Sequence, residues 1–222
     1  MGVVLRGANT AIAALCRYHW YNSVMASSAR DRSRTTKEAV LEAAGELLVA
    51  EGPEALSVRR LGDRVGASSQ AVYTLFGGKP GLAEALFREG FRRMATAFDA
   101  VPRTDDHLAY LAELMGAYRR MAQAHPAYYL VMFGRAIPGF SPSPDAKAAA
   151  WSTFATLVNA LDEGLAAGAI QPAVTQQTAQ ILWGVAHGLV SLELAGQLSA
   201  GTDGDERYDR AIQAFLEHCR AD

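Results

Sequence analysis

The feature that most limits how this chain can fold is a run of three short helical patterns between Thr35 and Phe76. Two breaks separate them. Gly52-Pro53 ends the first pattern, and Gly66 ends the second, where a residue without Cβ allows positive φ and a close approach of two helices. The apolar faces of the second and third helices then meet across a turn of about three or four residues. The spacing predicts a helix-turn-helix unit.

Each helix of this unit begins at a side chain that can cap it. Thr35 and Glu38 form a capping box at the first helix, and Ser57 and Ser68 are N-cap residues of the second and third. Behind the caps, apolar residues recur at helical spacing and predict a small shared core. The predicted core positions are Val40, Ala43, Ala44, Leu47, Leu48, Val58, Leu61, Val65, Val72 and Phe76.

The polar residues outside this core are candidates for reading duplex DNA. The major groove, about 12 Å wide, admits one α-helix; Arg pairs with guanine, Gln with adenine, and Ser, Thr and Tyr suit phosphates or base edges. Lys79 opens a fourth helix, whose N-terminus is a place for a phosphate. Alternatively, these are ordinary solvated residues of a small bundle. The candidate DNA-binding residues are Thr36, Ser57, Arg59, Arg60, Ser68, Ser69, Gln70, Tyr73, Thr74 and Lys79.

Charge is distributed unevenly along the 222 residues. The net charge of −2 by itself disfavours binding to nucleic acid. Residues 1–103, however, hold 14 Lys and Arg against 10 Asp and Glu, whereas residues 104–222 hold 7 against 13. The basic excess therefore lies in the half of the chain that contains the predicted helix-turn-helix unit.

Residues 1–34 precede that unit, and we expect them to be a flexible extension. Their apolar stretches are interrupted and fall short of the roughly 18 residues that span a bilayer. No clean apolar run precedes a small-residue cleavage site, so a signal peptide is a poor fit, and no membrane partner is expected. Met25 is an alternative start, because Met-Ala-Ser-Ser-Ala-Arg is a more ordinary beginning.

The second half of the chain contains only helical patterns, broken at Pro and Gly. The expected helices run from Lys79 to about Asp99 and over about 105–123, 126–134, 144–167, 173–197 and 205–220. The fold class is therefore all-α, with a DNA-binding unit over residues 35–80 and a helical bundle over 81–222. The two longest C-terminal patterns are apolar on more than one face, which favours a homodimer over a well-covered monomer core.

Aromatic side chains in the second half are candidates for an effector pocket. A few polar tips among apolar rings suit a small, largely apolar molecule, although plain core packing explains each of them as well. The candidate effector-binding residues are Tyr118, Met121, Phe133, Trp151, Phe154, Trp183 and His187.

Motifs for catalysis or metal binding are absent from the sequence. Cys16 and Cys219 lie far apart and outside any CxxC or Cys/His pattern, and the two cysteines fit a reducing cytoplasm. No phosphate loop or Gly-x-Ser-x-Gly elbow occurs. Ser191, one turn beyond His187, is the pairing that would suggest a small hydrolase, the alternative from another class. We expect no enzyme activity, no cofactor and no metal.

Two stretches resemble TetR-type transcriptional regulators. The first resembles their DNA-binding domain through TKEAVLEAA at 36–44, EGPEALSVRRL at 51–61, VGASSQAVY at 65–73 and FGGK at 76–79. It departs from the family at Leu75, where His is frequent, and at Gly77-Gly78, where a more polar pair is frequent. The second, residues 182–188, resembles the C-terminal domain of a subgroup marked by Trp, His and Gly, here Trp183, His187 and Gly188.

The resemblance implies a cytoplasmic, ligand-responsive regulator and in particular a repressor. Such a protein reads a palindromic operator in double-stranded DNA as a homodimer and leaves it when a small-molecule effector binds. The resemblance also implies that the helical bundle over residues 81–222 serves dimerisation and effector binding. The family's recognition helix falls on Ser68 to Thr74, its tyrosine on Tyr73 and its phosphate-binding lysine on Lys79. A helical adaptor that keeps the fold without binding DNA remains an alternative.

Overall fold

The computed structural model describes residues 36–221 except 135, 172–174 and 199–201. Its regular elements within these residues are all helices, apart from an isolated antiparallel bridge between Ile170 and Arg220. The predicted all-α class is therefore confirmed. None of the described helices is both long and apolar enough to cross a membrane. The expectations about Thr35 and about residues 1–34, including the alternative start, fall outside the described residues.

The helix-turn-helix unit comprises helix 36–51, α2 (Val58–Val65) and α3 (Ser69–Phe76), with a 3-10 turn, η1 (Pro53–Ala55), after the first. Ser57 and Ser68 cap α2 and α3 as predicted, because their hydroxyl oxygens accept hydrogen bonds from the backbone amides of Arg60 and Ala71, at 3.3 and 3.1 Å. The predicted core of the unit is confirmed: Val58 and Val65 are partly buried and the other eight positions are buried.

The turn between α2 and α3 depends on two glycines with separate roles. Gly66 has a φ of 67°, which provides the predicted left-handed turn, but a Cβ there would have no atom within 4 Å. The close approach predicted at Gly66 occurs instead at Gly62, whose Cβ would lie 2.5 Å from the carbonyl oxygen of Ala67. The sequence prediction was therefore correct for the turn and wrong for the contact.

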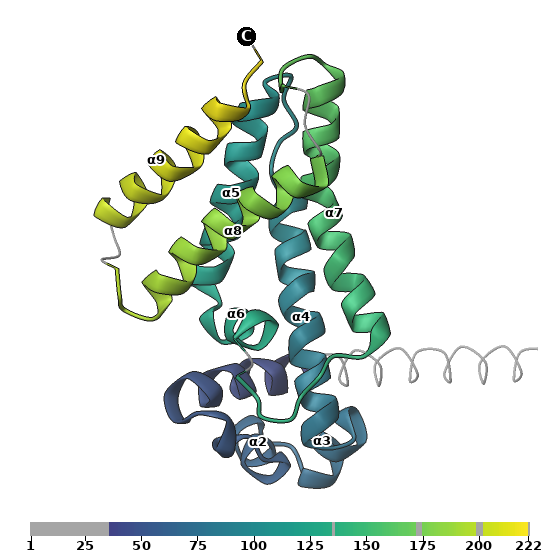
Figure 1. Ribbon diagram of the computed structural model, residues 1–222. Helices are drawn as coiled ribbons and strands as arrows, with labels where there is room; N and C mark the ends of the chain where they lie inside the picture. The colour runs from purple at the N-terminus through teal and green to yellow at the C-terminus, as the bar shows by residue number, and fades with distance from the viewer. Residues whose placement is uncertain (1–35, 135, 172–174, 199–201, 222) are drawn as a thin grey trace, which may run out of the picture.

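α4 (Lys79–Asp99) starts beside α3 and runs from the helix-turn-helix unit into the second half of the molecule (Figure 1). The junction is tight, since a Cβ on Gly81 would lie 1.7 Å from the carbonyl oxygen of Phe76. Gly77 and Gly78, where the chain departs from the family pattern, have φ values of 67° and 98°. These two glycines thus form the bend that holds the start of α4 against the end of α3.

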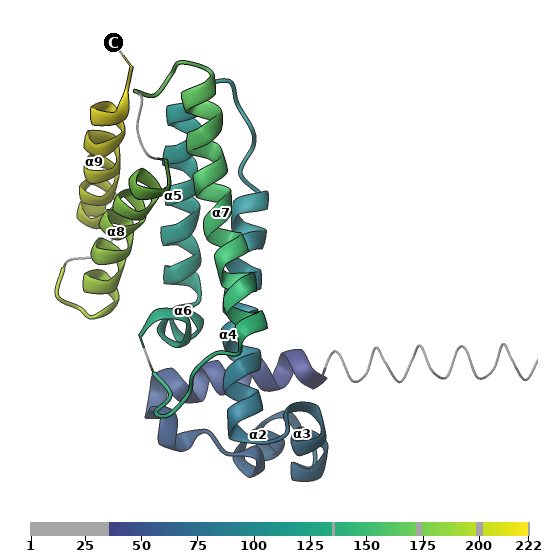
Figure 2. The same cartoon turned by 45° about the vertical axis from the view of Figure 1, so that its right-hand side comes forward.

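The C-terminal helices form a bundle around α5 (His107–Ala124) and α7 (Pro144–Ala166), which contact both α4 on one side and α8 (Thr175–Leu194) on the other. α9 (Thr202–Cys219) packs on α5 and α8, as the turned view shows (Figure 2). The short α6 (Pro126–Phe133) packs on α4 near the helix-turn-helix unit. The observed boundaries of α4 to α9 lie within three residues of those predicted.

Candidate functional site

An exposed polar surface covers the outer side of α3 and the start of α2. It comprises Arg59, Ser69, Gln70, Tyr73 and Thr74, and we call it the α3 surface. Tyr73, the aromatic residue of this surface, is 55% exposed, although large aromatic rings ordinarily bury most of their area. The α3 surface therefore presents hydrogen-bonding groups and an apolar ring together, from a rigid helix.

The other predicted DNA contacts have additional structural roles. Ser57 and Ser68 use their hydroxyls as helix caps. Arg60 donates two hydrogen bonds to the carboxylate of Glu51, at 2.7 and 2.9 Å, and so lies toward helix 36–51. Thr36 is partly buried at the start of the described chain, and Lys79 is the partly buried first residue of α4. The structure brings Lys79 close to the α3 surface, because Gly78 lies beside the ring of Tyr73.

A cavity of about 390 Å³ lies among α4, α5, α6, α7 and α8. Five of the seven predicted effector residues line it: Tyr118, Phe133, Trp151, Phe154 and Trp183. The prediction missed the α4 side of the wall, which Phe91, Met94 and Phe98 provide. Their i, i+3, i+7 spacing shows in the sequence as an apolar helical stripe. The sequence does not show that this stripe faces a cavity.

Met121 does not line this cavity. The cavity ends before the turn of α5 that carries Met121, which is buried in a separate groove beside Val101 and His125. His187 is also absent from the lining of the cavity. It lies behind the wall and packs against the ring of Trp183, with 5.3 Å between ring centroids. Both residues are on helices that line the cavity, but neither side chain is part of its wall.

His187 belongs to a hydrogen-bonded network at one end of the cavity. Its Nδ1 lies 2.7 Å from the hydroxyl of Tyr129 and 2.9 Å from that of Tyr118. Trp183 Nε1 donates to the Tyr118 hydroxyl at 3.3 Å, and Ser191 Oγ lies 3.4 Å from His187 Nε2. Burial lowers the pKa of His187 and raises the pKa of both tyrosines. The network is therefore uncharged near pH 7.

The serine and histidine of this network do not form a hydrolytic triad. Within the described part of the chain, no carboxylate is hydrogen-bonded to His187, and Ser191 is shared with the hydroxyl of Tyr129 at 3.2 Å. A triad requires an acidic group that orients the histidine. The described residues also include no group of three His, Cys, Asp or Glu side chains placed to hold a metal ion.

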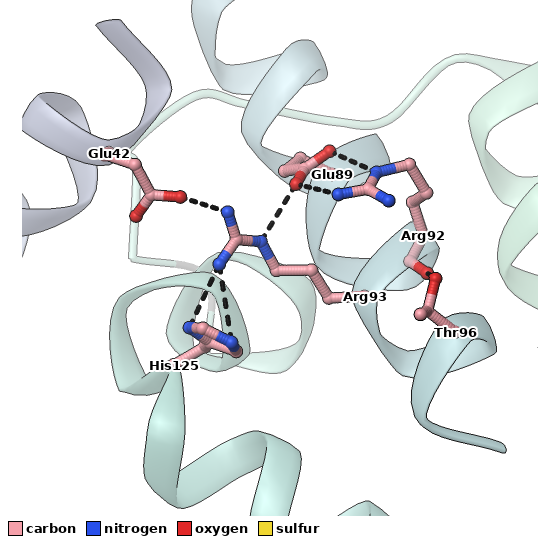
Figure 3. Close-up of polar contacts among 6 residues, drawn as sticks. All are labelled: Glu42, Glu89, Arg92, Arg93, Thr96 and His125. Atoms are coloured by element: carbon pink, nitrogen blue, oxygen red, sulfur yellow. Dashed lines mark hydrogen bonds and ion pairs between the residues drawn. The ribbon is translucent and has the colours of Figure 1, made fainter. Parts of the chain in front are cut away.

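Arg93 of α4 connects the helix-turn-helix unit with the bundle (Figure 3). Its guanidinium pairs with Glu42 of helix 36–51, donates to Glu89 at 2.9 Å and donates to His125 Nδ1 at 3.1 Å. It also lies 4.4 Å from the centre of the Tyr128 ring. Burial and the adjacent guanidinium lower the pKa of His125, so this imidazole accepts the hydrogen bond in its neutral form. We call these five residues the Arg93 cluster.

An uncharged strip follows the outer face of α8. It consists of Ile181, Gly184, Gly188 and Leu192, which lie on one side of the helix, and continues to Ala195 just after the helix end. Ile181 is 57% exposed and Leu192 is 40% exposed, and a Cβ on either glycine would have open space around it. A long apolar strip with gaps at its glycines is typical of a helix that another helix approaches closely. We call it the α8 strip.

Two family models match the chain. The model described as "Bacterial regulatory proteins, tetR family" matches residues 40–86, which include α2 and α3. The model described as "Tetracyclin repressor-like, C-terminal domain" matches residues 111–215, which run from α5 into α9. No curated protein matches the chain significantly.

Solved structures share most of the fold. A protein of unknown function from Rhodococcus sp. RHA1 is 26% identical, with a TM-score of 0.73 over 83% of this chain and 95% of that one. The TetR family regulator PfmR from Thermus thermophilus is 19% identical, with a TM-score of 0.67 over 80% and 97%. A TetR family transcription regulator from Marinobacter aquaeolei VT8 is 22% identical, with a TM-score of 0.69 over 87% and 100%.

Proposed function

We propose that this chain, which belongs to the TetR family of bacterial regulatory proteins, is a homodimeric repressor released from its operator by a small, largely apolar effector. Family membership makes it a DNA-binding helix-turn-helix regulator of transcription. One observation carries the more specific proposal: an exposed DNA-reading surface and an apolar cavity share the helix α4, which begins at one and lines the other.

In the proposed complex, α3 enters the major groove. Gln70, Tyr73 and Thr74 would face base edges or the flanking backbone, and Arg59 would hold a phosphate or a guanine. Lys79 and the first amides of α4 would hold a second phosphate. Arg60 would have to leave Glu51 before it could reach DNA, so we expect its contribution to be smaller than that of Arg59.

Linkage accounts for release. The cavity wall includes three side chains of α4 and Phe133 of α6, and both helices also contact the helix-turn-helix unit through the Arg93 cluster. The ligand is expected to bind more tightly to the conformer whose two recognition helices are wrongly spaced for the operator. The ratio of its affinities for the two conformers sets how much it lowers the affinity for DNA, and bound DNA lowers the affinity for the ligand by the same factor.

Removing the charge of Arg93 tests whether this cluster ties the unit to the bundle. In Arg93→Met we expect amide hydrogen exchange in helix 36–51 to become about tenfold faster relative to α5, because partly buried hydrogen bonds between charged groups are lost. The matched control is Arg92→Met, since Arg92 is exposed and pairs with Glu89 of its own helix. Equal exchange in the two variants would show that the cluster contributes no coupling.

The α8 strip is the proposed dimer interface. A two-fold dimer would place two recognition helices in half-sites about 34 Å apart. We expect Leu192→Glu to convert the dimer to monomer at micromolar concentration, measured by sedimentation velocity, because a buried unpaired carboxylate is costly in an apolar interface. Ala148→Glu, an exposed site on α7, should leave the dimer intact. A wild-type chain that sediments as a monomer contradicts the assignment.

The function itself is tested by operator capture and release. Purified protein is mixed with fragmented DNA from its own genome, the retained fragments are sequenced, and small molecules are screened for their release. We expect one or a few palindromic fragments, bound with an affinity that falls steeply with salt. Retention of no fragment at low salt would favour the adaptor alternative.

A further inference from the structure

Aromatic rings line the cavity from five helices, with Tyr118 on α5. Phe91 of α4 meets Phe133 of α6 at 5.6 Å between centroids, and Trp183 of α8 meets Phe133 at 5.9 Å and Phe154 of α7 at 6.1 Å. The rings are inclined to one another by 50° to 76°, so they offer both faces and edges to the enclosed space. A flat aromatic ligand completes such an arrangement with edge-to-face and offset contacts.

The size of the cavity limits the ligand. At about 390 Å³, it lies at the small end of the roughly 300–1,000 Å³ typical of ligand pockets. The exposed residues of the lining, Trp151, Gln180 and Gly184, mark its opening between α7 and α8. The inner lining, with Met94 and Met115, is buried. A molecule with one or two fused rings fits within this space.

Charge is absent from the cavity wall. None of the described lining residues is Asp, Glu, Lys, Arg or His, and the hydrogen-bonding network behind the wall is uncharged as well. An ionic ligand would lose its water without gaining a counter-charge, which is a large cost in an apolar environment. The lining therefore discriminates against anions, and a cation would gain only cation–π contacts with the rings in exchange for its water.

One donor at the wall makes a long hydrogen bond. Trp183 Nε1 can only donate, and its bond to the Tyr118 hydroxyl, 3.3 Å long, exceeds the roughly 2.7–3.2 Å of ordinary N–H···O bonds. The same hydroxyl is shared with Tyr129 at 3.2 Å and with His187 at 2.9 Å. The hydroxyl of Thr153 lies 3.4 Å from a carbonyl oxygen of its own helix. A ligand acceptor would give Trp183 a better partner.

We propose that the ligand of this cavity is an uncharged aromatic molecule of one or two rings whose hydrogen-bond acceptor is bound by Trp183 Nε1. Its role as an effector rests on the proposed function, whereas its chemistry rests on the wall of the cavity. An aromatic ketone, ester or ether fits this description. An aromatic acid or amine of the same shape does not.

Four naphthalenes of nearly identical shape test the proposal. 2-Acetylnaphthalene is neutral with an acceptor, 2-isopropenylnaphthalene is neutral without one, 2-naphthoate is an anion and 2-naphthamidinium is a cation. Their dissociation constants for the full chain are measured by calorimetry without DNA. We expect the ketone to bind about fivefold more tightly than the isopropenyl compound, the effect of one hydrogen bond. It should bind roughly tenfold or more tightly than either ion.

The variant Trp183→Phe tests which group binds the acceptor. The ratio of the ketone's affinity to that of the isopropenyl compound should fall to about one, and taking the ratio within one variant cancels any change in cavity shape. The matched control is Trp151→Phe, which removes the other lining indole, 60% exposed at the opening, and should keep the ratio. If Trp183→Phe does not fold, the ranking of the four probes by the unaltered protein still decides the question of charge.

Three results would overturn the inference: an ion that binds as tightly as the ketone, no measurable binding of either neutral probe, or an unchanged ratio in Trp183→Phe. The proposed function fails separately. If the neutral probes bind but never release operator DNA, the effector role is wrong and the ligand chemistry stands. If ions release the DNA while the neutral probes do not bind, the effector role stands and the ligand chemistry is wrong.

Discussion

Replacing Tyr73 by alanine should weaken operator binding by about 30-fold or more and leave the fold unchanged. The ring is 55% exposed and contributes little to the core, so its removal costs little stability. It lies in the middle of the α3 surface, where an aromatic side chain that becomes fully buried on binding typically contributes about 2 kcal/mol or more. The measurement is a fluorescence-anisotropy titration of operator DNA at fixed salt, with thermal unfolding of the free protein as the check on folding.

Two arginines of α2 give a matched comparison, because Arg59 belongs to the α3 surface and Arg64 does not. Arg59→Ala should reduce operator affinity about tenfold and lower the salt slope by about one, as expected for loss of a phosphate contact. Arg64→Ala removes another exposed arginine of α2, which pairs with Glu46 of helix 36–51 at 3.1 Å, and should have little effect. If Tyr73→Ala and Arg59→Ala bind the operator as tightly as the unaltered protein, α3 is not the recognition helix.

Local signals in the sequence predicted the helices because the forces that start and end a helix are local. Ser57 and Ser68 cap through amides three residues away, and Gly66 provides a left-handed residue, all within one turn of chain. Gly62 was missed because its importance depends on where the carbonyl of Ala67 comes to lie, which follows from the path of the turn. Backbone approaches of this kind have no signature in residue type alone.

Contacts between distant parts of the sequence could not be predicted. Arg93 and Glu42 are 51 positions apart, and nothing in their spacing pairs them. The cavity was only partly predicted for the same reason. Aromatic positions on helical stripes indicated which side chains are buried, whereas the empty space between them depends on how five helices pack. Met121 and His187 were assigned to that space because periodicity gives a helix face but not its neighbour.

The most consequential feature that the sequence did not predict is an ion pair buried between α5 and α8. The side chains of Arg119 and Glu193 are 8% and 3% exposed and are joined by bonds of 3.0 and 3.2 Å. Arg119 also pairs with Asp205 of α9 and lies 5.2 Å from the centre of the Tyr208 ring. Arg119 therefore connects α5 with α8, which carries the α8 strip, and with α9.

Breaking this pair from one side should destabilise the protein strongly. In Arg119→Met the buried carboxylate of Glu193 keeps Arg207, which is 30% exposed and 3.1 Å away, and the side-chain amide of Gln123 at 3.5 Å. We expect the free energy of unfolding to fall by about 3 kcal/mol, the low end of the range for a buried pair that loses one partner. The corresponding decrease in Tm is roughly 6–12 °C for a chain of this size, measured by calorimetry at fixed protein concentration.

Removing both charges should restore most of that loss. In the double variant Arg119→Met/Glu193→Leu no buried unpaired carboxylate remains, since Asp205 is 62% exposed. Apolar side chains of similar volume replace the pair, an exchange that is often neutral or better for stability. The exposed pair of Arg220 and Glu217 is the matched control, because Arg220→Met should leave Tm unchanged. A double variant as unstable as Arg119→Met would mean that the loss comes from Asp205 and Tyr208, the other partners of Arg119, and not from the stranded carboxylate. Recovery in the double variant would instead mean that α5 and α8 remain packed without the ion pair. The pair would then select how α5 and α8 pack and contribute little to the free energy of unfolding.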